Sequence, residues 1–190
     1  MHHALSLTSL DIILNENRDN LSEILIPMVK DTVTRLCQSD NSKFKPDNIC
    51  GPTLFHFTQL TNVILTETVD WGHNKKLTWI EDTIIKLNYD SLEEMVLRLR
   101  IAKPWQVTIK NTRRLLGHLP SIDNHVAKQV TLNVKSSRPF VFNVCLPVDF
   151  RRTMDISQII AVIKNLCSRC DKIGVLKFSH WDPDSDDETY

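Results

Sequence analysis

The chain has little glycine, only four of its 190 residues. No Gly-x-Gly-x-x-Gly or P-loop pattern occurs, and both patterns need glycines that let the backbone approach a phosphate. No apolar run approaches the roughly 20 residues that cross a bilayer as a helix. The N-terminus shows no cationic segment followed by an apolar stretch, so no secretory signal is expected. These absences argue against a phosphate-cradling nucleotide site and against a membrane span.

An excess of one charge is also missing. Lys and Arg number 23, Asp and Glu number 23, and the formal net charge is zero. General nucleic-acid binders and membrane-surface binders normally carry a basic excess, so the composition argues against both classes. The five cysteines are an odd number, and without a visible leader they favour reduced thiols in the cytosol or nucleus.

The N-terminal part, residues 1–103, is expected to be a helical domain. Apolar residues recur at helical spacing over 21–36 and over 54–65. Two further stretches, Thr78–Glu81 and Ser91–Glu94, fit the capping box, in which a hydroxyl and a carboxylate bond backbone amides at a helix start. No internal repeat is visible in this part or in the rest of the chain.

After Pro104 the apolar period changes to two. Residues 105–109, 130–134 and 140–146 alternate between apolar and polar, which is typical of half-buried strands. A helical stripe follows, and its members are Ile156, Ile159, Ile160, Ile163 and Cys167.

The expected fold class is therefore α+β. The all-helical domain over 1–103 would be followed, over 104–172, by a three-stranded antiparallel sheet and one C-terminal helix. So small a sheet cannot cover both of its faces with one helix, and it needs cover from the rest of the chain or from another chain.

The same strands carry a resemblance to a known family. A Trp heads the first strand in Trp105–Ile109, and a second strand follows at Gln129–Val134. The third strand runs into a helix through a short passage with Pro and Phe, Phe140–Phe150. This layout resembles the COMM domain, the C-terminal module of the COMM-domain protein family. The chain length and the expected helical N-terminal half agree with that resemblance.

The resemblance implies a non-enzymatic scaffold or adaptor subunit without a cofactor. Modules of this family pair as homo- or heterodimers and join coiled-coil scaffold subunits in the Commander-type assembly, which supports endosomal sorting and recycling of membrane cargo. The family is also linked to NF-kappa-B control, ubiquitin-ligase regulation and copper handling. A cytoplasmic, endosome-associated location is implied, with the nucleus as an alternative. The residues expected at the pairing face, or in the core beneath it, are Trp105, Val107, Ile109, Val130, Leu132, Val134, Phe140, Phe142 and Val144.

A small metal-binding or redox protein is the main alternative. Cys167 and Cys170 form one Cys-x-x-Cys pair, but a zinc site needs four ligands, and His118 and His125 would have to complete it. The simpler interpretation places both cysteines one turn apart on a helix as buried packing residues. His3 could join the terminal amine and two backbone nitrogens in a square-planar set for Cu(II) or Ni(II), although so short a motif is often incidental.

A divergent enzyme is the third hypothesis. Ser, His and Asp are all present, but neither Gly-x-Ser-x-Gly nor His-Glu-x-x-His occurs. The last stretch, 173–190, is expected to be an acidic tail with a phosphorylatable Ser185. Trp181 is unusual in such a tail, and it gains by docking onto this chain or onto a partner.

Overall fold

The structure is a computed structural model of the chain, and it describes residues 8–14, 31–40, 57–69, 77–101, 112–114, 116–132, 139–147 and 156–181. Its strands are β1 (Ser9–Leu14), β2 (Arg35–Asp40), β3 (Asn62–Val69), β4 (Glu94–Ile101), β5 (Val141–Pro147) and β6 (Leu176–Trp181). Its helices are α2 (Thr78–Lys86), α4 (Leu119–Leu132), α6 (Ile156–Leu166) and α7 (Ser168–Lys172).

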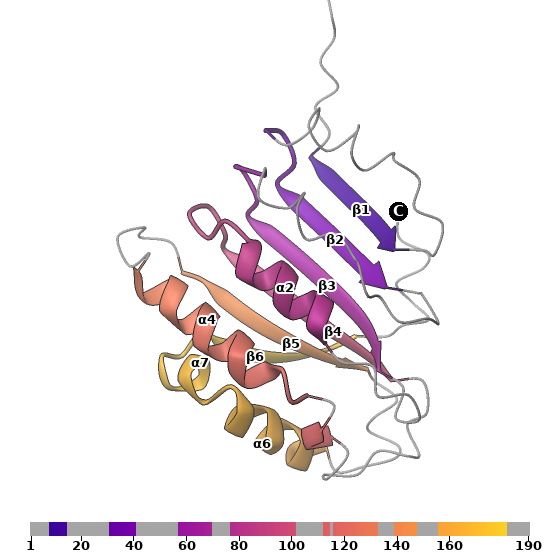
Figure 1. Ribbon diagram of the computed structural model, residues 1–190, viewed down its shortest axis with the longest axis vertical. Coiled ribbons are helices and arrows are strands. Elements are labelled where there is room, and N and C mark those ends of the chain that lie inside the picture. Colours follow the sequence, from indigo (N-terminus) through magenta and orange to yellow (C-terminus); the bar gives the residue numbers. More distant parts are fainter. Residues whose placement is uncertain are drawn as a thin grey trace, which may run out of the picture.

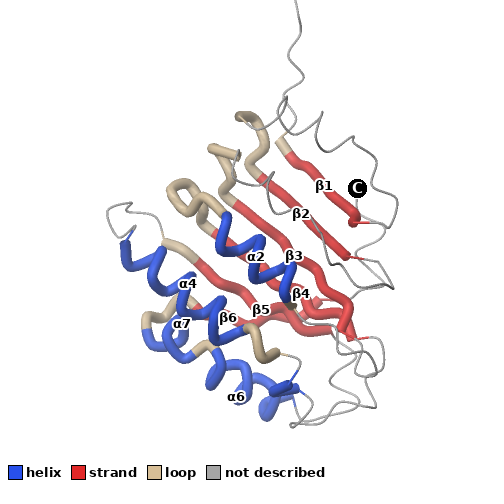
Figure 2. The backbone as a smooth tube through the Cα atoms, viewed as in Figure 1, coloured by secondary structure: helices blue, strands red, loops and turns tan. Residues whose placement is uncertain are grey.

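All six strands form one parallel sheet in the order β1-β2-β3-β4-β5-β6 (Figure 1). The order never reverses, unlike in doubly wound folds, where a reversal places helices on both faces. Crossovers of the usual right hand that always step in one direction return over the same face of the sheet. Accordingly, α2, α4, α6 and α7 lie in one layer on one side of the strands (Figure 2). This is the connectivity of a solenoid, in which each coil packs on its neighbours.

The coils share one register although their lengths differ. The residues that pair across the first five strands are Ser9, Arg35, Asn62, Glu94 and Val141. They are separated along the chain by 26, 27, 32 and 47 residues. Most of these intervals fall in the range of natural solenoid repeats, but their inequality hides the repeat from a search for a fixed period.

A threonine ladder joins the first three coils. The carbonyl of Thr8 accepts the backbone N–H groups of Thr34 and Arg35, at 2.9 and 3.1 Å. The carbonyl of Thr34 accepts those of Thr61 and Asn62 in the same way. The hydroxyls of Thr34 and Thr61 donate to the same two carbonyls, each at 3.2 Å. The expectation of no internal repeat is therefore wrong, because the structure stacks equivalent Thr-x-apolar segments at 8–10, 34–36 and 61–63.

The main core lies between the sheet and the helix layer. Strand side chains alternate between the two faces, and one set points to the helices. That set includes Leu36, Val63, Leu65, Met95, Leu97, Phe142, Val144 and Leu176, all buried. They pack with buried helix residues such as Ile80, Ile84, Ile122, Val126, Ile159 and Ile163 in a single cluster. Each large side chain buried in this way stabilises the fold by about 1.5–3 kcal/mol relative to full exposure.

The expected all-helical N-terminal domain is wrong. Strands β2, β3 and β4 occupy parts of the chain for which helices were predicted, and the capping box at Ser91–Glu94 lies at the entry of a strand. In β4, Met95, Leu97 and Leu99 are buried on one face and Val96 on the other. A parallel strand buried on both faces is a nearly continuous apolar run, which also matches helical spacing.

In the N-terminal part, the helix expected to begin at Thr78 is partly confirmed. A helix does begin at Thr78, but its N-cap is Leu77 and no side chain caps it. The predicted boundary at Lys103 lies outside the described residues, between β4 and β5, which pair as neighbours in one sheet. Residues from both sides of that boundary share the main core.

The expected three-stranded antiparallel sheet is also wrong. Residues 105–109 lie outside the described part of the chain. Val130 and Leu132, expected in a strand, belong to α4, while the expected strand at 140–146 is present as β5 but runs parallel to its neighbours. The helix over Ile156–Leu166 is confirmed as α6.

The chain after Lys172 does not begin a tail. Gly174 turns the backbone at a φ of 76°, a left-handed conformation that glycine adopts without a steric penalty. Leu176–Trp181 then forms β6, which pairs with β5. The alternative that Trp181 docks onto its own chain is confirmed, because it packs against a buried cluster. Residues 182–190, which contain Ser185, lie outside the described residues.

Candidate functional site

The face of the sheet opposite the helices is the candidate site, and we call it the open face. No helix among the described residues covers it (Figure 2). Ile64, Val96 and Cys145 form a small buried cluster there, with Cys37 and Trp181 packed against it. These residues come from β2 to β6, so every strand after β1 contributes to one apolar strip. The open face is thus a second, smaller apolar surface on the same sheet.

A hollow of about 510 Å³ lies on this face. Its walls combine charged, amide, hydroxyl and apolar side chains from β2 to β6. The lining residues are Arg35, Asn62, Ile64, Glu94, Val96, Arg98, Asn143, Cys145, Ser179, His180 and Trp181. The volume of this hollow lies within the range of protein binding pockets.

Arg98 and Trp181 form the most distinctive pair in the hollow. The guanidinium carbon of Arg98 lies 5.3 Å from the centroid of the Trp181 ring, within the range of a cation–π interaction. The indole Nε1 of Trp181 is buried and has no hydrogen-bond partner among the described residues. A buried donor without a partner costs about 1–3 kcal/mol, so a ligand that supplies an acceptor there would recover this free energy.

The amide of Asn62 is used on one side only. Its Nδ2 donates to Glu94 Oε2 at 2.5 Å. Its Oδ1 is buried and has no hydrogen-bond partner in the described part of the chain. The hollow therefore presents one unsatisfied acceptor at Asn62 and one unsatisfied donor at Trp181.

Side-chain contacts between β5 and β6 join three of the residues that line the hollow. The hydroxyl of Ser179 lies 3.0 Å from Asn143 Oδ1 and 3.1 Å from Cys145 Sγ. These contacts join β5 to β6 beside the apolar strip.

A Ser–His–carboxylate arrangement occurs on the helix side, but its geometry does not suit nucleophilic catalysis. Nδ1 of His118 lies 2.5 Å from Glu81 Oε2. Burial acts to raise the pKa of Glu81, but hydrogen bonds from Ser121 and His118, with the His118 charge, bring the pKa below its ordinary value. Serine and histidine thus bind the same carboxylate, whereas an activated serine must bond the imidazole.

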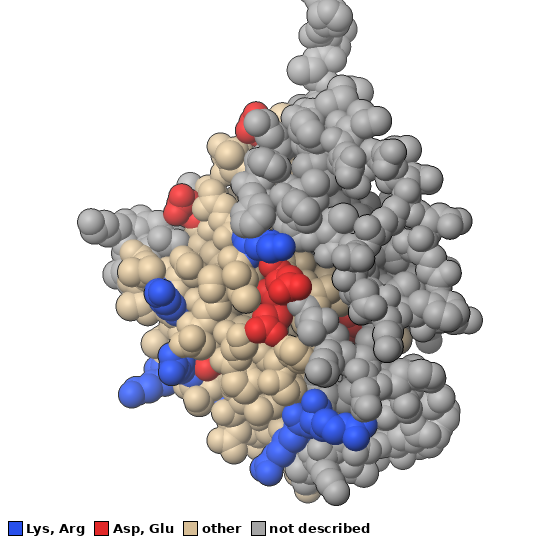
Figure 3. Space-filling model, viewed as in Figure 1, with Lys and Arg blue, Asp and Glu red and all other residues tan. Residues whose placement is uncertain are grey.

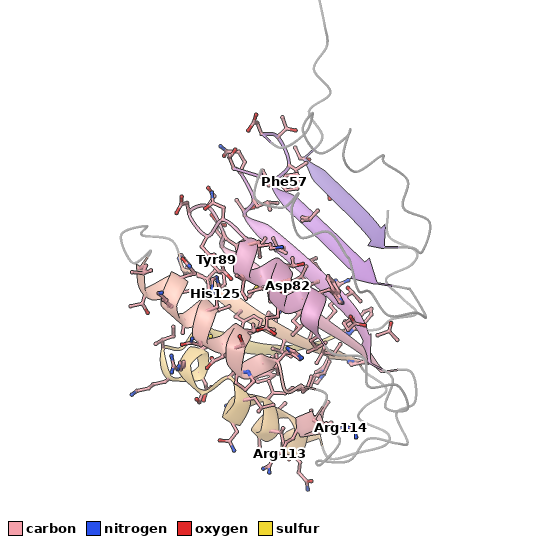
Figure 4. The ribbon with its side chains drawn as sticks, in the orientation of Figure 1. Phe57, Asp82, Tyr89, Arg113, Arg114 and His125 are labelled. Atoms are coloured by element: carbon pink, nitrogen blue, oxygen red, sulfur yellow. The ribbon has the colours of Figure 1, made fainter. Side chains whose placement is uncertain are left out.

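The rest of the helix side carries mixed charge. Acidic side chains gather over α2, where Asp82 is exposed, and basic side chains lie around them (Figures 3 and 4). Arg113 and Arg114 are exposed in a short helical turn. The described residues of this surface form no extended field of one sign.

Cys167 and Cys170 are buried, which confirms them as packing residues. Burial, followed by the charges of Asp123 and Asp171, raises the pKa of Cys167 to about 12. Burial and a hydrogen bond in which the thiol donates to the Asp123 side chain also raise the pKa of Cys170. A metal or redox site needs the thiolate, and these surroundings oppose it.

The histidines do not converge with these thiols. His118 pairs with Glu81, and His125 packs against Tyr89 with ring centroids 5.8 Å apart (Figure 4). Among the described residues, no three His, Cys, Asp or Glu side chains are grouped to hold a metal ion. His3 lies outside those residues.

The structure describes five of the nine residues expected at a pairing face or in the core beneath it. Trp105, Val107, Ile109 and Val134 lie outside the described residues. Leu132 is 64% exposed near the end of α4, whereas Phe142 and Val144 are fully buried beneath the helices. Val130 and Phe140 are partly buried and pack against the main core.

The open-face residues were not among the site residues predicted from the sequence. Their signal was alternation: Glu94, Val96 and Arg98 are two residues apart and point to the same face of β4. Nothing in one strand's sequence shows which other strands will stand beside it.

None of the described helices is both long and apolar enough to span a bilayer.

Comparison of the chain with profiles of known protein families, with curated proteins and with solved structures found no match. Function is therefore inferred from the fold and from the chemistry of the open face.

Proposed function

We propose that this protein is a non-enzymatic binding subunit whose open face receives a partner protein. The observation that carries the proposal is the hollow on that face, where an apolar strip lies beside the unsatisfied Asn62 Oδ1 and Trp181 Nε1. Interfaces combine a central apolar patch, often with Trp and Arg, and a polar rim. Solenoid proteins commonly bind partners on such extended sheet surfaces.

A COMM-domain protein remains one candidate for that partner, and so do the coiled-coil scaffold subunits of an endosomal assembly. These identities are predictions from the resemblance of 104–172 to the COMM domain. The sheet that suggested face-to-face pairing is replaced by a parallel one, so the open face is now the surface proposed to pair. The scaffold or adaptor role itself is retained.

The experiment compares two charge-reversed variants of the full chain. Arg35→Glu with Lys177→Glu changes two exposed residues of strands β2 and β6. Lys128→Glu with Lys172→Glu makes the same change in charge at exposed positions of α4 and α7. Proteins cross-linked to each variant in cells are identified, and binding of the purified partner is then measured directly.

The proposal expects the open-face variant to lose the partner and the helix-side variant to keep it. Both variants should unfold at the temperature of the unmodified protein, because exposed substitutions seldom change stability by more than about 0.5 kcal/mol. Equal binding by the two variants, or loss only in the helix-side variant, would show that the open face is not the binding surface.

A further inference from the structure

We infer that the hollow on the open face binds a carboxylate side chain from an acidic, extended segment of the partner, with Arg98 and the indole N–H of Trp181 as donors. This inference rests on the proposed function and specifies the chemistry of the partner. The first support is the donor set. The indole nitrogen can only donate, and the guanidinium carries five N–H donors in a planar fork. A carboxylate offers two oxygens with about four acceptor sites, which suits both groups together.

The position of the two donors is fixed by the sheet. Arg98 pairs in register with Cys145, Cys145 with Ser179, and Trp181 is two residues farther along β6. The 5.3 Å separation between the guanidinium carbon and the ring centroid brings both donors to the same part of the hollow. Apolar Val96 and Cys145 lie beside them. Because an apolar surrounding lowers the local dielectric, charge-assisted hydrogen bonds there are stronger than in water.

The described charges of the open face favour a negative partner. Arg35 and Lys177 are basic and exposed, and Glu94 is acidic. The Glu94 carboxylate already accepts the Asn62 amide at 2.5 Å. The chain as a whole has no net charge, so this is a local bias, too small for general binding of a polyanion such as nucleic acid. A segment with a few carboxylates matches it better.

The second unsatisfied atom suggests the form of that segment. Asn62 Oδ1 is an acceptor and suits a backbone N–H, which an extended chain exposes. Asn62 pairs with Glu94, and Arg98 is four residues farther along β4. That offset is roughly 13 Å along the strand, about the length of four extended residues. One short extended segment can therefore reach both Asn62 and the Arg98–Trp181 pair.

The test uses a short fluorescent peptide in which Glu alternates with Leu, and matched peptides in which every Glu is Gln, Lys or phosphoserine. Binding to the full chain is followed by fluorescence anisotropy. We expect the Glu peptide to bind at least tenfold more tightly than the Gln peptide, and the Lys peptide not to bind. Raising the salt concentration should weaken the binding of the Glu peptide.

Two substitutions test the roles of Trp181 and Arg98 as hydrogen-bond donors. Trp181→Phe keeps an aromatic ring beneath Arg98 but removes the N–H, and it should weaken binding several-fold. Arg98→Gln removes the charge and should weaken binding tenfold or more. Lys172→Gln on α7 is the matched loss of one positive charge and should leave binding unchanged. Melting curves of all variants keep loss of binding separate from loss of folding.

Several outcomes would overturn the inference. These are equal binding of the Glu and Gln peptides, no effect of Trp181→Phe, or tighter binding of the phosphoserine peptide, which would identify a phosphorylated partner instead. Binding that appears only after deletion of 182–190 would show that this chain's own acidic segment fills the hollow. If no Glu peptide binds but the Arg35→Glu, Lys177→Glu variant still loses its cellular partner, the acidic partner is wrong and the proposed function stands. If that variant keeps the partner, the proposed function fails.

Discussion

Asp123 on α4 binds the start of α7 through Cys170, 47 residues farther along the chain. Its carboxylate accepts the backbone N–H of Cys170 at 2.8 Å and that of Arg169 at 3.1 Å. Asp123 is buried, and its own carbonyl oxygen lies 3.6 Å from the Cys170 sulfur. A helix of five residues cannot satisfy its own first N–H groups, so a side chain from another helix does so.

Asp123→Ala is therefore expected to lower the free energy of unfolding by about 2–3 kcal/mol, because two backbone N–H groups lose a buried acceptor. Asp123→Asn should cost less, since its one remaining oxygen can still accept a hydrogen bond. Urea unfolding followed by circular dichroism measures both. Asn124→Ala is the control, because Asn124 is exposed and accepts only from the Arg169 side chain among the described contacts. A similar loss for Asn124→Ala would contradict the role given to Asp123.

Trp79 on α2 donates its indole N–H to the carboxylate of Glu67 on β3, and both residues are buried. Trp79→Phe should destabilise the fold by about 1–3 kcal/mol, because the carboxylate loses a donor inside the core. Glu67→Leu should do the same by leaving the indole N–H without an acceptor. The double variant should lose less than the two single losses combined, because it leaves neither polar group of the pair behind.

A double-mutant cycle from urea unfolding measures that coupling. A coupling free energy of about 0.5–3 kcal/mol is expected for residues in direct contact. Strictly additive losses would show that the two side chains do not stabilise each other.

His125 packs against Tyr89, and burial, followed by the charge of Lys128, lowers its pKa below 6.5. The folded protein then binds fewer protons at this site than the unfolded chain does, so the site's contribution to stability is present above pH 6.5. That contribution is lost as the pH falls from 6.5 through the lower folded pKa. The unmodified protein should lose stability between about pH 7 and pH 5, and His125→Asn should lose less.

Urea unfolding at several pH values checks this, and NMR titration of the His125 ring measures its pKa directly. Lys128→Ala should move that pKa upward by removing the nearby charge. His180→Gln, at an exposed position, serves as the control and should keep the pH dependence of the unmodified protein. A His125→Asn variant with an unchanged pH profile would contradict the prediction.

Division of the chain at Lys103 is expected to destroy the fold. Strands β4 and β5 lie on opposite sides of this position and pair from Glu94–Val141 to Arg98–Cys145. Fragments 1–103 and 104–190 would each expose half of a shared core and a new sheet edge. Neither fragment should unfold cooperatively alone, and the two should regain strand signal when mixed. Cooperative unfolding of either fragment by itself would support two independent domains.

The apolar pattern along the chain was sufficient to predict the secondary structure of two segments. Over Val141–Val144 the strand alternates between half-buried and buried residues, and the helix with Ile159 and Ile163 has a single apolar stripe, so both were predicted from sequence. The burial of Cys167 beside that stripe follows from the same spacing. Each of these segments has a period that fits one type of secondary structure.

The pattern failed where a strand buries both faces. Met95–Leu99 is apolar at four of five positions, and such a run matches a helix as well as a strand. A repeat was also present in the sequence, as the three apolar-Thr-x-apolar segments at the starts of β1, β2 and β3. The hydrogen bonds between Thr8, Thr34 and Thr61 show that the threonines of these segments occupy equivalent positions.

The sequence by itself determined which residues are apolar, which elements have one buried face, and that the chain carries no net charge. Only the tertiary structure decided that six strands stand in chain order, so that all described helices fall on one side and the other side stays open. Asn62, Arg98 and Trp181 line one hollow there because parallel pairing aligns residues from β3, β4 and β6 that are tens of positions apart. That alignment comes from backbone hydrogen bonds and core packing between strands, which no single segment of the sequence encodes.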